Sequence, residues 1–204
     1  MLAGGRGSRL GGAKACTQLA GVPLIAYPLR AARAADLEAI VIAKPGTPLP
    51  ALEERVLHEP ELPRHPLCGV VRALEYVAER GGAGELGAVA EQGEASPTRA
   101  VVVVACDLPF LTPELLQMLA NIEGTAMAAL DGRAQPTLCR CERRDLPALR
   151  EALARSLAFQ EALAERSPRI VGELELARFG DPERLLFNVN SETDLARAEG
   201  WLQS

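Results

Sequence analysis

Residues 1–21 read MLAGGRGSRLGGAKACTQLAG, and this stretch decides how the rest of the sequence is interpreted. Five glycines, at positions 4, 5, 7, 11 and 12, alternate with the cations Arg6, Arg9 and Lys14. Glycine backbone N–H groups and cationic side chains together form concave sites for phosphate oxygens. The stretch therefore predicts a loop that grips a polyphosphate, and a solvated glycine-rich turn is the alternative.

Two familiar glycine loops do not match this stretch. The P-loop requires Lys directly after Gly, whereas Ala13 separates Gly12 from Lys14. The dinucleotide fingerprint GxGxxG, started at Gly5, meets Leu10 where its third glycine belongs. Both of these loop types are excluded.

Composition limits the class of protein. A chain of 204 residues that is 48% hydrophobic predicts one domain spanning residues 1–204. A net charge of −5 offers no basic field, so free nucleotides are expected as partners and nucleic acid and membranes are not. The five cysteines lack CxxC spacing and indicate reduced thiols. Neither a signal-peptide pattern nor a long apolar run is present, which predicts a cytoplasmic protein.

Strand and helix patterns alternate along the chain. Apolar runs at 39–43 and 100–105 predict buried parallel strands, and strands at 126–130 and 137–141 around a turn at 131–133 predict a hairpin. The glycine-rich segment 81–99 predicts a flexible insertion. The pattern predicts an α/β fold, a three-layer Rossmann-like sandwich with a mostly parallel sheet and a small antiparallel hairpin. Helices are expected at 23–35, 49–56, 69–80, 113–120, 145–154, 156–165 and 192–202.

Asp107 follows the most apolar predicted strand. Ligands of open α/β sheets bind beyond the carboxyl ends of the strands, so this carboxylate is a candidate Mg²⁺ ligand; a loop or helix cap is the alternative. Chemistry on a bound polyphosphate needs donors around the phosphates, a cation near the attacked phosphorus and a carboxylate for Mg²⁺. The catalytic candidates are Arg9, Lys14 and Asp107.

The first loop, with Ser8, Arg9 and Lys14 and the turn at 21–24, resembles the signature loop of nucleotidyltransferases, most closely that of the molybdenum cofactor guanylyltransferases. The run Cys106-Asp107-Leu108-Pro109-Phe110 resembles the metal motif of the same family. His65-Pro66-Leu67-Cys68-Gly69 resembles its base-binding loop, and Glu59 is the nearest candidate for its guanine-recognising acid. The resemblance implies nucleotide binding by Leu2, Ala3, Gly4, Gly5, Lys14, Glu59, Pro66, Leu67, Gly69 and Asp107.

Two later segments extend the resemblance. Asn188-Val189-Asn190 resembles the terminal Asn-x-Asn motif of the family and implies that Asn190 joins Asp107 at Mg²⁺, although a turn and helix cap also explains Asn190. The segment 131–137 resembles one that lies toward the acceptor in these enzymes, or it is only a hairpin turn. The acceptor-side candidates are Gln135, Pro136 and Asn188.

The resemblance implies Mg²⁺-dependent transfer of GMP from GTP to molybdopterin-bound molybdenum cofactor, with release of pyrophosphate. It allows transient contact with enzymes that receive the cofactor. The alternatives are the same chemistry with CTP or another phosphorylated acceptor, and a degenerate protein that only binds nucleotide.

Two features depart from the family pattern. Ala13 replaces the usual Asp before Lys14, and only Met1-Leu2-Ala3 remain of the strand that should precede the loop. We therefore expect a sheet whose first strand is largely missing. One hypothesis is that Met1 corresponds to an internal valine encoded by GTG, which upstream codons would test.

Overall fold

The computed structural model describes residues 1–4, 10, 12–82 and 100–203. Its sheet contains β3 (Ile40–Ala43) and β4 (Arg55–His58), which pair in parallel, and a second group in the order β5-β7-β6-β8. This second group comprises β5 (Ala100–Val104), β6 (Ala126–Leu130), β7 (Arg133–Glu142) and β8 (Arg169–Val171). Leu2 joins the two groups, because it forms parallel bridges with both Ile42 and Ala105.

The sheet is mostly parallel, as predicted. Among these strands, β7 alone runs against its neighbours; it pairs antiparallel with β5 and with β6. The β6–β7 pair is the hairpin predicted around residues 131–133, and Asp131 and Gly132 at its turn have φ angles of 51° and 69°. The mixed α/β class is confirmed.

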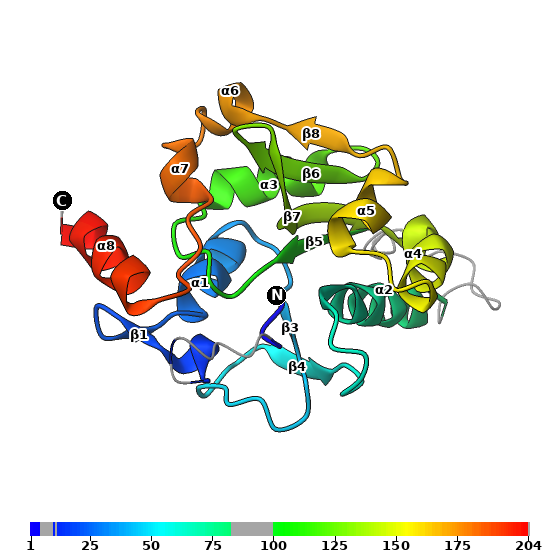
Figure 1. The fold of residues 1–204 in the computed structure, drawn as a ribbon, viewed down its shortest axis with the longest axis horizontal. Helices are drawn as coiled ribbons and strands as arrows, with labels where there is room; N and C mark the ends of the chain where they lie inside the picture. The colour runs from blue at the N-terminus through cyan, green and yellow to red at the C-terminus, as the bar shows by residue number, and fades with distance from the viewer. Residues whose placement is uncertain (5–9, 11, 83–99, 204) are drawn as a thin grey trace, which may run out of the picture.

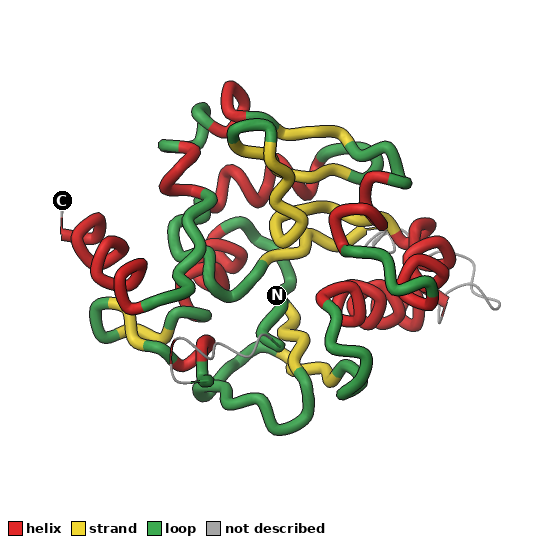
Figure 2. The backbone as a smooth tube through the Cα atoms, in the orientation of Figure 1, coloured by secondary structure: helices red, strands yellow, loops and turns green. Residues whose placement is uncertain are grey.

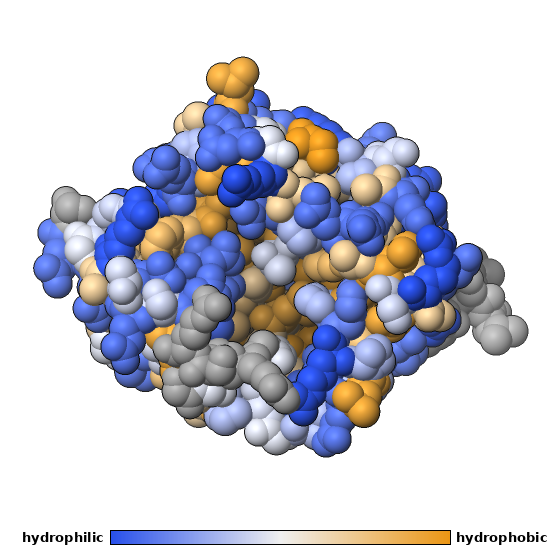
Figure 3. All heavy atoms as spheres, in the orientation of Figure 1, coloured by the Kyte–Doolittle hydropathy of each residue, from blue (hydrophilic) through white to orange (hydrophobic). Residues whose placement is uncertain are grey.

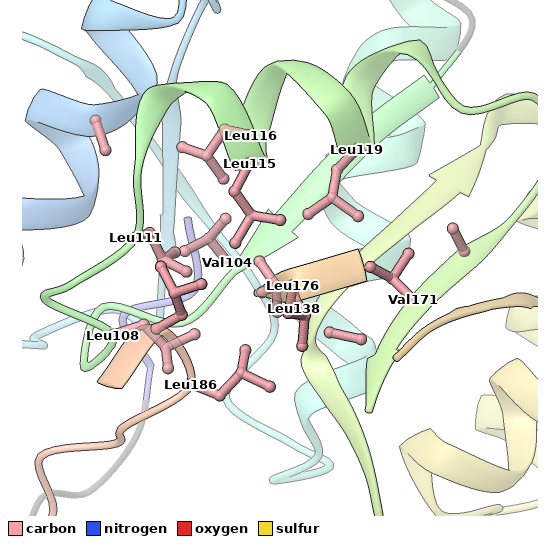
Figure 4. Close-up of a cluster of buried hydrophobic side chains, with 14 of the residues drawn as sticks. Val104, Leu108, Leu111, Leu115, Leu116, Leu119, Leu138, Val171, Leu176 and Leu186 are labelled. Atoms are coloured by element: carbon pink, nitrogen blue, oxygen red, sulfur yellow. The ribbon is translucent and has the colours of Figure 1, made fainter. Parts of the chain in front are cut away.

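Helices cover both faces of the strands, which makes three layers (Figures 1 and 2). On one face, α1 (Ala26–Ala34) and α3 (Pro113–Asn121) pack over Val104 and Leu138, and Figure 4 shows Leu115 and Leu119 of α3 pointing toward these strands. On the other face, α2 (Pro66–Gly82), α4 (Leu146–Ala154) and α5 (Phe159–Ala164) pack over Val103. Successive strand residues face opposite sides, so the apolar run at 100–104 contributes to both cores.

Two predicted helix starts were wrong. α1 begins at Ala26 instead of residue 23, because Val22–Pro23 (β2) pairs with Gln18–Leu19 (β1) in a short hairpin. Pro28 lies in the first turn of α1, where a missing N–H removes no helical bond. α2 begins at Pro66, so the predicted base-binding loop forms its first turn; His65 Nδ1 accepts a hydrogen bond from the Leu67 N–H at 3.1 Å.

Other boundaries also differ from the predictions. The expected helix at 49–56 is absent: residues 55–58 form β4 because pairing with β3 satisfies their backbone groups. The helix expected at 156–165 begins only at Phe159, since Ser156 has a φ of 57°. α2 continues to Gly82, and residues 83–99 of the expected insertion lie outside the described residues.

The C-terminal part adds elements that were not predicted. These are β8, α6 (Glu173–Leu176) and α7 (Pro182–Leu185); Leu176 and Leu185 are buried in the core beneath α3. The predicted last helix is α8 (Glu192–Gln203), which Trp201 anchors by edge-on ring contacts with Phe110 and Phe187 at centroid distances of 5.5 and 4.8 Å. Within the described ranges, no helix is long and apolar enough to cross a membrane.

Candidate functional site

Three segments that are far apart in the chain meet beyond the carboxyl end of β5. Lys14 begins the short 3₁₀ turn η2 (Lys14–Cys16), Asp107 follows β5, and Asn190 precedes α8. The Lys14 Nζ donates hydrogen bonds to Asp107 Oδ2 and, at 2.6 Å, to Asn190 Oδ1. The structure therefore brings together one predicted catalytic cation and both predicted metal ligands.

The Lys14–Asp107 ion pair is largely withdrawn from solvent. The two side chains are 13% and 10% exposed. Asp107 Oδ1 is buried and has no hydrogen-bond partner among the described residues. Because buried polar atoms are normally satisfied, this free oxygen marks a place where the protein alone leaves a ligand position open.

Backbone and capping contacts hold Asn190 beside Asp107. The Val189 N–H donates to the Asp107 carbonyl at 3.0 Å. Asp194 Oδ2 accepts from the Asn190 N–H at 3.0 Å and from the Ser191 hydroxyl at 2.8 Å, which fixes the start of α8. The capping interpretation of this segment and the proximity of Asn190 to Asp107 are therefore compatible.

The oxygen donors suit Mg²⁺. The described residues contain no group of three or more His, Cys, Asp or Glu side chains that could hold a metal. Mg²⁺ needs no such cage, because it keeps several waters and binds through one or two carboxylates together with substrate phosphates. The free Oδ1 of Asp107 fits that pattern, and the amide oxygen of Asn190, which accepts from Lys14 Nζ, is the second oxygen beside it.

A second acidic group, Glu59, lies beside Gly4, where the glycine-rich loop begins. Glu59, directly after β4, is 7% exposed, and its Oε1 lies 3.3 Å from Lys44 Nζ. A Cβ added to Gly4 would stand 2.6 Å from this Oε1, and one added to Gly69 would stand 3.2 Å from Oε2. Burial raises the pKa of Glu59 above its usual value, and the charge of Lys44 opposes that shift. A side chain at Gly4 would therefore meet the Glu59 carboxylate, and one at Gly69 would meet first Leu2 Cδ2, at 2.7 Å, and then this carboxylate.

The first residues of the chain lie between these two groups. The Leu2 N–H donates to the Val104 carbonyl at 2.7 Å, and the Ala3 N–H donates to the Ile42 carbonyl at 2.9 Å. Ala3 is 3% exposed, so its side chain belongs to the core. The backbone at Leu2 and Ala3 therefore places Gly4 between the Asp107 side and the Glu59 side of the site.

The remaining predicted nucleotide-binding residues do not lie at the Lys14–Asp107 pair in the described structure. Leu67 is fully buried in the core, and its N–H is already bonded to His65, while Pro66 opens α2. Gly5 and Arg9 lie outside the described residues.

The acceptor-side candidates lie on two segments. Gln135 and Pro136 belong to β7, where its register with β6 shifts. The next residue, Thr137, accepts from the Ala105 N–H at 3.0 Å, which brings the segment to within two residues of Asp107 along the chain. Asn188 turns its amide back to the Leu186 carbonyl at 3.1 Å.

Sequence reasoning missed Lys44. Its Nζ pairs with Glu59 and donates to the Pro60 carbonyl at 2.7 Å, so it holds the segment after β4 in place. The available signal was its position directly after the strand predicted at 39–43, on the ligand-binding edge of the sheet.

Known proteins resemble the chain in sequence and in fold. The sequence matches the MobA-like NTP transferase domain over residues 1–169. The molybdenum cofactor guanylyltransferase of Rhodobacter capsulatus is 31% identical over 209 residues, covering 100% of this chain and 95% of that protein. The enzyme of the same name from Pseudomonas putida is 31% identical, with coverages of 91% and 93%.

Solved structures share the fold. The molybdopterin-guanine dinucleotide biosynthesis protein A of Archaeoglobus fulgidus gives a TM-score of 0.74 at 20% identity, over 99% of this chain and 96% of that chain. The 2-C-methyl-D-erythritol 4-phosphate cytidylyltransferase of Thermus thermophilus gives 0.64 at 20% identity, over 100% and 98%. At these identities the structures establish the fold alone, and they confirm the Rossmann-like type.

The sequence relatives confirm the resemblance that the motifs indicated. They match this chain nearly from end to end, and the matched region includes the first loop, Glu59 and Asp107. The chain therefore belongs to the MobA-like NTP transferase family and is a nucleotidyltransferase, like the molybdenum cofactor guanylyltransferases that it resembles.

Proposed function

We propose that this protein transfers GMP from GTP to the terminal phosphate of a molybdopterin-type acceptor and releases pyrophosphate, with Mg²⁺ as cofactor. The observation that carries the proposal is the meeting of Lys14, Asp107 and Asn190 beyond the end of β5, in a chain whose relatives are named guanylyltransferases. Such an enzyme would act in the cytoplasm and pass its product to enzymes that receive the cofactor.

The reaction needs no covalent enzyme intermediate; the protein has to position the phosphates and neutralise their charge. An oxygen of the acceptor phosphate attacks the α-phosphorus of GTP, and the bond from that phosphorus to the bridging oxygen of the β-phosphate breaks as pyrophosphate leaves. Positioning and electrostatic stabilisation supply most of the acceleration in such transfers. Lys14 brings a positive charge to this point, and its two oxygen partners orient its ammonium group.

Asp107 and Asn190 would hold the Mg²⁺. When bound, this ion would screen the phosphate oxygens and stabilise the negative charge that develops on the leaving pyrophosphate. Asp107 Oδ1 is free to serve it, and the Val189–Asp107 backbone bond keeps the two ligand-bearing segments together.

Glu59 supports guanine as the base. Guanine presents two adjacent donors, N1–H and N2–H, which a carboxylate can accept together. Glu59 is paired with Lys44. It lies against Gly4, at the start of the glycine-rich loop, and against Gly69, where a base could approach the backbone closely. A lone cytosine amino group would use only one of the two carboxylate oxygens.

A nucleotide panel tests the base. With Mg²⁺ present, GTP should raise the melting temperature, and CTP, ATP and UTP should not, because a ligand stabilises the folded state to which it binds. Glu59→Gln should weaken GTP binding by about 10-fold to 100-fold, through loss of a charged hydrogen-bond acceptor. Stabilisation by CTP without GTP would reject the guanylyl assignment in favour of a cytidylyltransferase.

Pyrophosphate release tests the acceptor and the chemistry. Release from GTP should require added molybdopterin-bound cofactor and should be abolished by Asp107→Ala. If the protein binds GTP but releases no pyrophosphate with any acceptor, the result would instead support the degenerate alternative, a nucleotide-binding protein that has lost turnover.

A further inference from the structure

Lys44 and Glu59 are the first residues beyond two adjacent parallel strands. Ala43, the last residue of β3, pairs with His58, the last residue of β4, and the Glu59 N–H donates to the Ala43 carbonyl at 3.0 Å. The carboxyl ends of parallel strands meet at one edge of a sheet, where ligands bind in open α/β folds. The register of β3 and β4 therefore places an ammonium group beside a carboxylate at the ligand-binding edge.

Three oxygen atoms surround the Lys44 ammonium group. The Nζ donates to the Pro60 carbonyl at 2.7 Å, and it lies 3.3 Å from Glu59 Oε1 and 3.5 Å from the Pro63 carbonyl. Of these three distances, the first is that of a strong N–H···O bond, and the other two are longer than the usual range. The Pro60 contact therefore fixes the position of the ammonium group, and the two long contacts leave it donor capacity for a ligand.

Lysine is rare in this chain. Of its 22 basic residues, 20 are Arg, and the two Lys are Lys14 and Lys44. Both pair with an acidic group of the candidate site, Lys14 with Asp107 and Lys44 with Glu59. An ammonium group is a compact charge with three rotatable donors, whereas a guanidinium group is a flat fork of fixed geometry. Lys44 thus brings to the base side of the site the same compact donor that Lys14 brings to the phosphate side.

Together, the side chains of Lys44 and Glu59 present a row of one donor and two acceptors. Glu59 Oε1 faces Lys44 and Gly4, and Oε2 faces Gly69. The order along the row is therefore the Lys44 ammonium donor, then Oε1, then Oε2. Guanine presents the complementary order on one edge, with O6 as an acceptor followed by N1–H and N2–H as donors. The row repeats the order in which cytosine presents its amino group, N3 and O2 to guanine in a base pair.

The space in front of this row is kept clear of side chains. A Cβ on Gly4 would stand 2.6 Å from Glu59 Oε1 and 3.8 Å from Lys44 Cγ, and one on Gly69 would stand 3.2 Å from Oε2. Figure 3 shows the surface hollowed where Figure 1 marks the N-terminus, and the backbone from there leads to Gly4. The Lys44 side chain keeps 17% of its surface exposed, so its ammonium group is accessible to a ligand.

We propose that Lys44 is a specificity-determining residue, whose ammonium group donates to O6 of guanine while the Glu59 carboxylate accepts from N1–H and N2–H. The inference rests on the proposed function, which makes GTP the nucleotide. Adenine would place its amino donor against the ammonium group and its N1 acceptor against the carboxylate. The Lys44–Glu59 pair therefore favours guanine and opposes adenine with the same two charges.

A change of one atom in the nucleotide tests the contact in the wild-type protein. 6-Thio-GTP keeps N1–H and N2–H but carries sulfur, a weak hydrogen-bond acceptor, in place of O6. With Mg²⁺ present, the Kd of the wild-type protein for 6-thio-GTP, measured by titration calorimetry, should be about 10-fold higher than its Kd for GTP. ITP serves as a second comparison, because it keeps O6 and N1–H and lacks the 2-amino group.

Lys44→Met shows whether the effect of sulfur belongs to Lys44. The variant keeps an apolar stem beside Gly4 and removes the donor, so the Kd for GTP and the Kd for ITP should both rise by about 10-fold to 100-fold. The Kd for 6-thio-GTP should rise by about 3-fold or less, because its sulfur accepts little from the ammonium group.

Arg64→Met is the matched control. Arg64 is exposed in the same segment between β4 and α2, so its loss removes one positive charge without removing a member of the row. This variant should weaken the binding of all three nucleotides equally, by about 3-fold or less, because an exposed charge acts through screened solvent.

The outcomes separate this proposal from the proposed function. Equal weakening of GTP and 6-thio-GTP binding by Lys44→Met would mean that Lys44 acts only by holding Glu59. Equal binding of the two nucleotides by the wild-type protein, a comparison that needs no variant, would mean that no donor reaches O6. Either result would overturn the role of Lys44 at O6, while GTP binding itself would still support the proposed function. A wild-type protein that does not bind GTP would overturn both.

Discussion

Replacing Lys14 with Met tests whether this cation stabilises the candidate site by pairing with Asp107 and Asn190, the two proposed metal ligands. The substitution keeps most of the apolar stem and removes the ammonium group that contacts Asp107 and Asn190. The Asp107 carboxylate, which is 10% exposed, then loses the cationic partner that it has among the described residues.

The expected loss follows from the burial of the pair. Removing one member of a well-buried ion pair costs about 3–5 kcal/mol, because the other charge stays buried and uncompensated. Both side chains here keep slight solvent contact, which reduces the expected cost to about 2–3 kcal/mol. For a chain of this size, that loss corresponds to a fall in melting temperature of about 4–12 °C in a metal-free buffer with EDTA.

Mg²⁺ should partly reverse the loss. If the ion binds at Asp107 and Asn190, it replaces the missing positive charge, so Mg²⁺ should raise the melting temperature of Lys14→Met more than that of the wild type. Lys14→Met should also lower kcat/KM by about 100-fold or more, because the cation near the transferred phosphate is lost.

Two controls sharpen this experiment. Lys14→Arg retains the charge and should lose less stability than Lys14→Met. In the double variant Lys14→Met with Asp107→Asn, a neutral carboxamide replaces the carboxylate, so no unpaired charge is left buried. The stability lost by the double variant should therefore be smaller than the sum of the losses in Lys14→Met and in Asp107→Asn. Equal melting temperatures of Lys14→Met and wild type in EDTA would refute the reasoning, as would the absence of any added response to Mg²⁺.

Three further predictions concern the framework around the site. Gly69→Ala should lose about 1–3 kcal/mol and weaken GTP binding, because its Cβ would stand 2.7 Å from Leu2 Cδ2; Gly200→Ala, with open space at its Cβ, is the matched control and should not destabilise. Leu115→Ala, at a fully buried position of α3, should lose about 2–5 kcal/mol in denaturant unfolding and leave the Kd for GTP unchanged. Folding lowers the pKa of the Met1 ammonium from 8.0 to about 6, so the unfolded chain binds more protons in that interval and the free energy of unfolding rises with pH. The rise should be about 3 kcal/mol between pH 5 and pH 9 and should be absent in the N-acetylated protein, whose own pH profile provides the reference for other titrating groups.

Local patterns were sufficient for the longer elements. The runs at 39–43 and 100–105 are apolar and rich in β-branched residues, and they form buried strands in the structure; the Asp-Gly turn at 131–132 predicted the β6–β7 hairpin correctly. Thr112 followed by Pro113 marked the start of α3, where the Thr112 hydroxyl accepts from the Leu115 N–H at 3.3 Å. These features depend on neighbouring residues in the chain, which the sequence displays directly.

Short strands escaped prediction because backbone pairing, and not a side-chain pattern of their own, decides where they form. β4 replaced an expected helix, and the two-residue strands β1 and β2 carry almost no periodic pattern of their own. β4 forms because β3 accepts and donates its backbone hydrogen bonds, whereas β1 and β2 pair only with each other in a short hairpin.

By itself, the sequence determined the alternating α/β pattern, the glycine-rich start and the candidate residues Lys14, Asp107 and Asn190. Only the tertiary structure decided that Lys14 lies between the other two and that Lys44 holds Glu59 against Gly4 and Gly69. The physical reason is that motifs record which groups a chain carries, whereas the distance between groups 93 or 176 positions apart is set by how the sheet and helices pack.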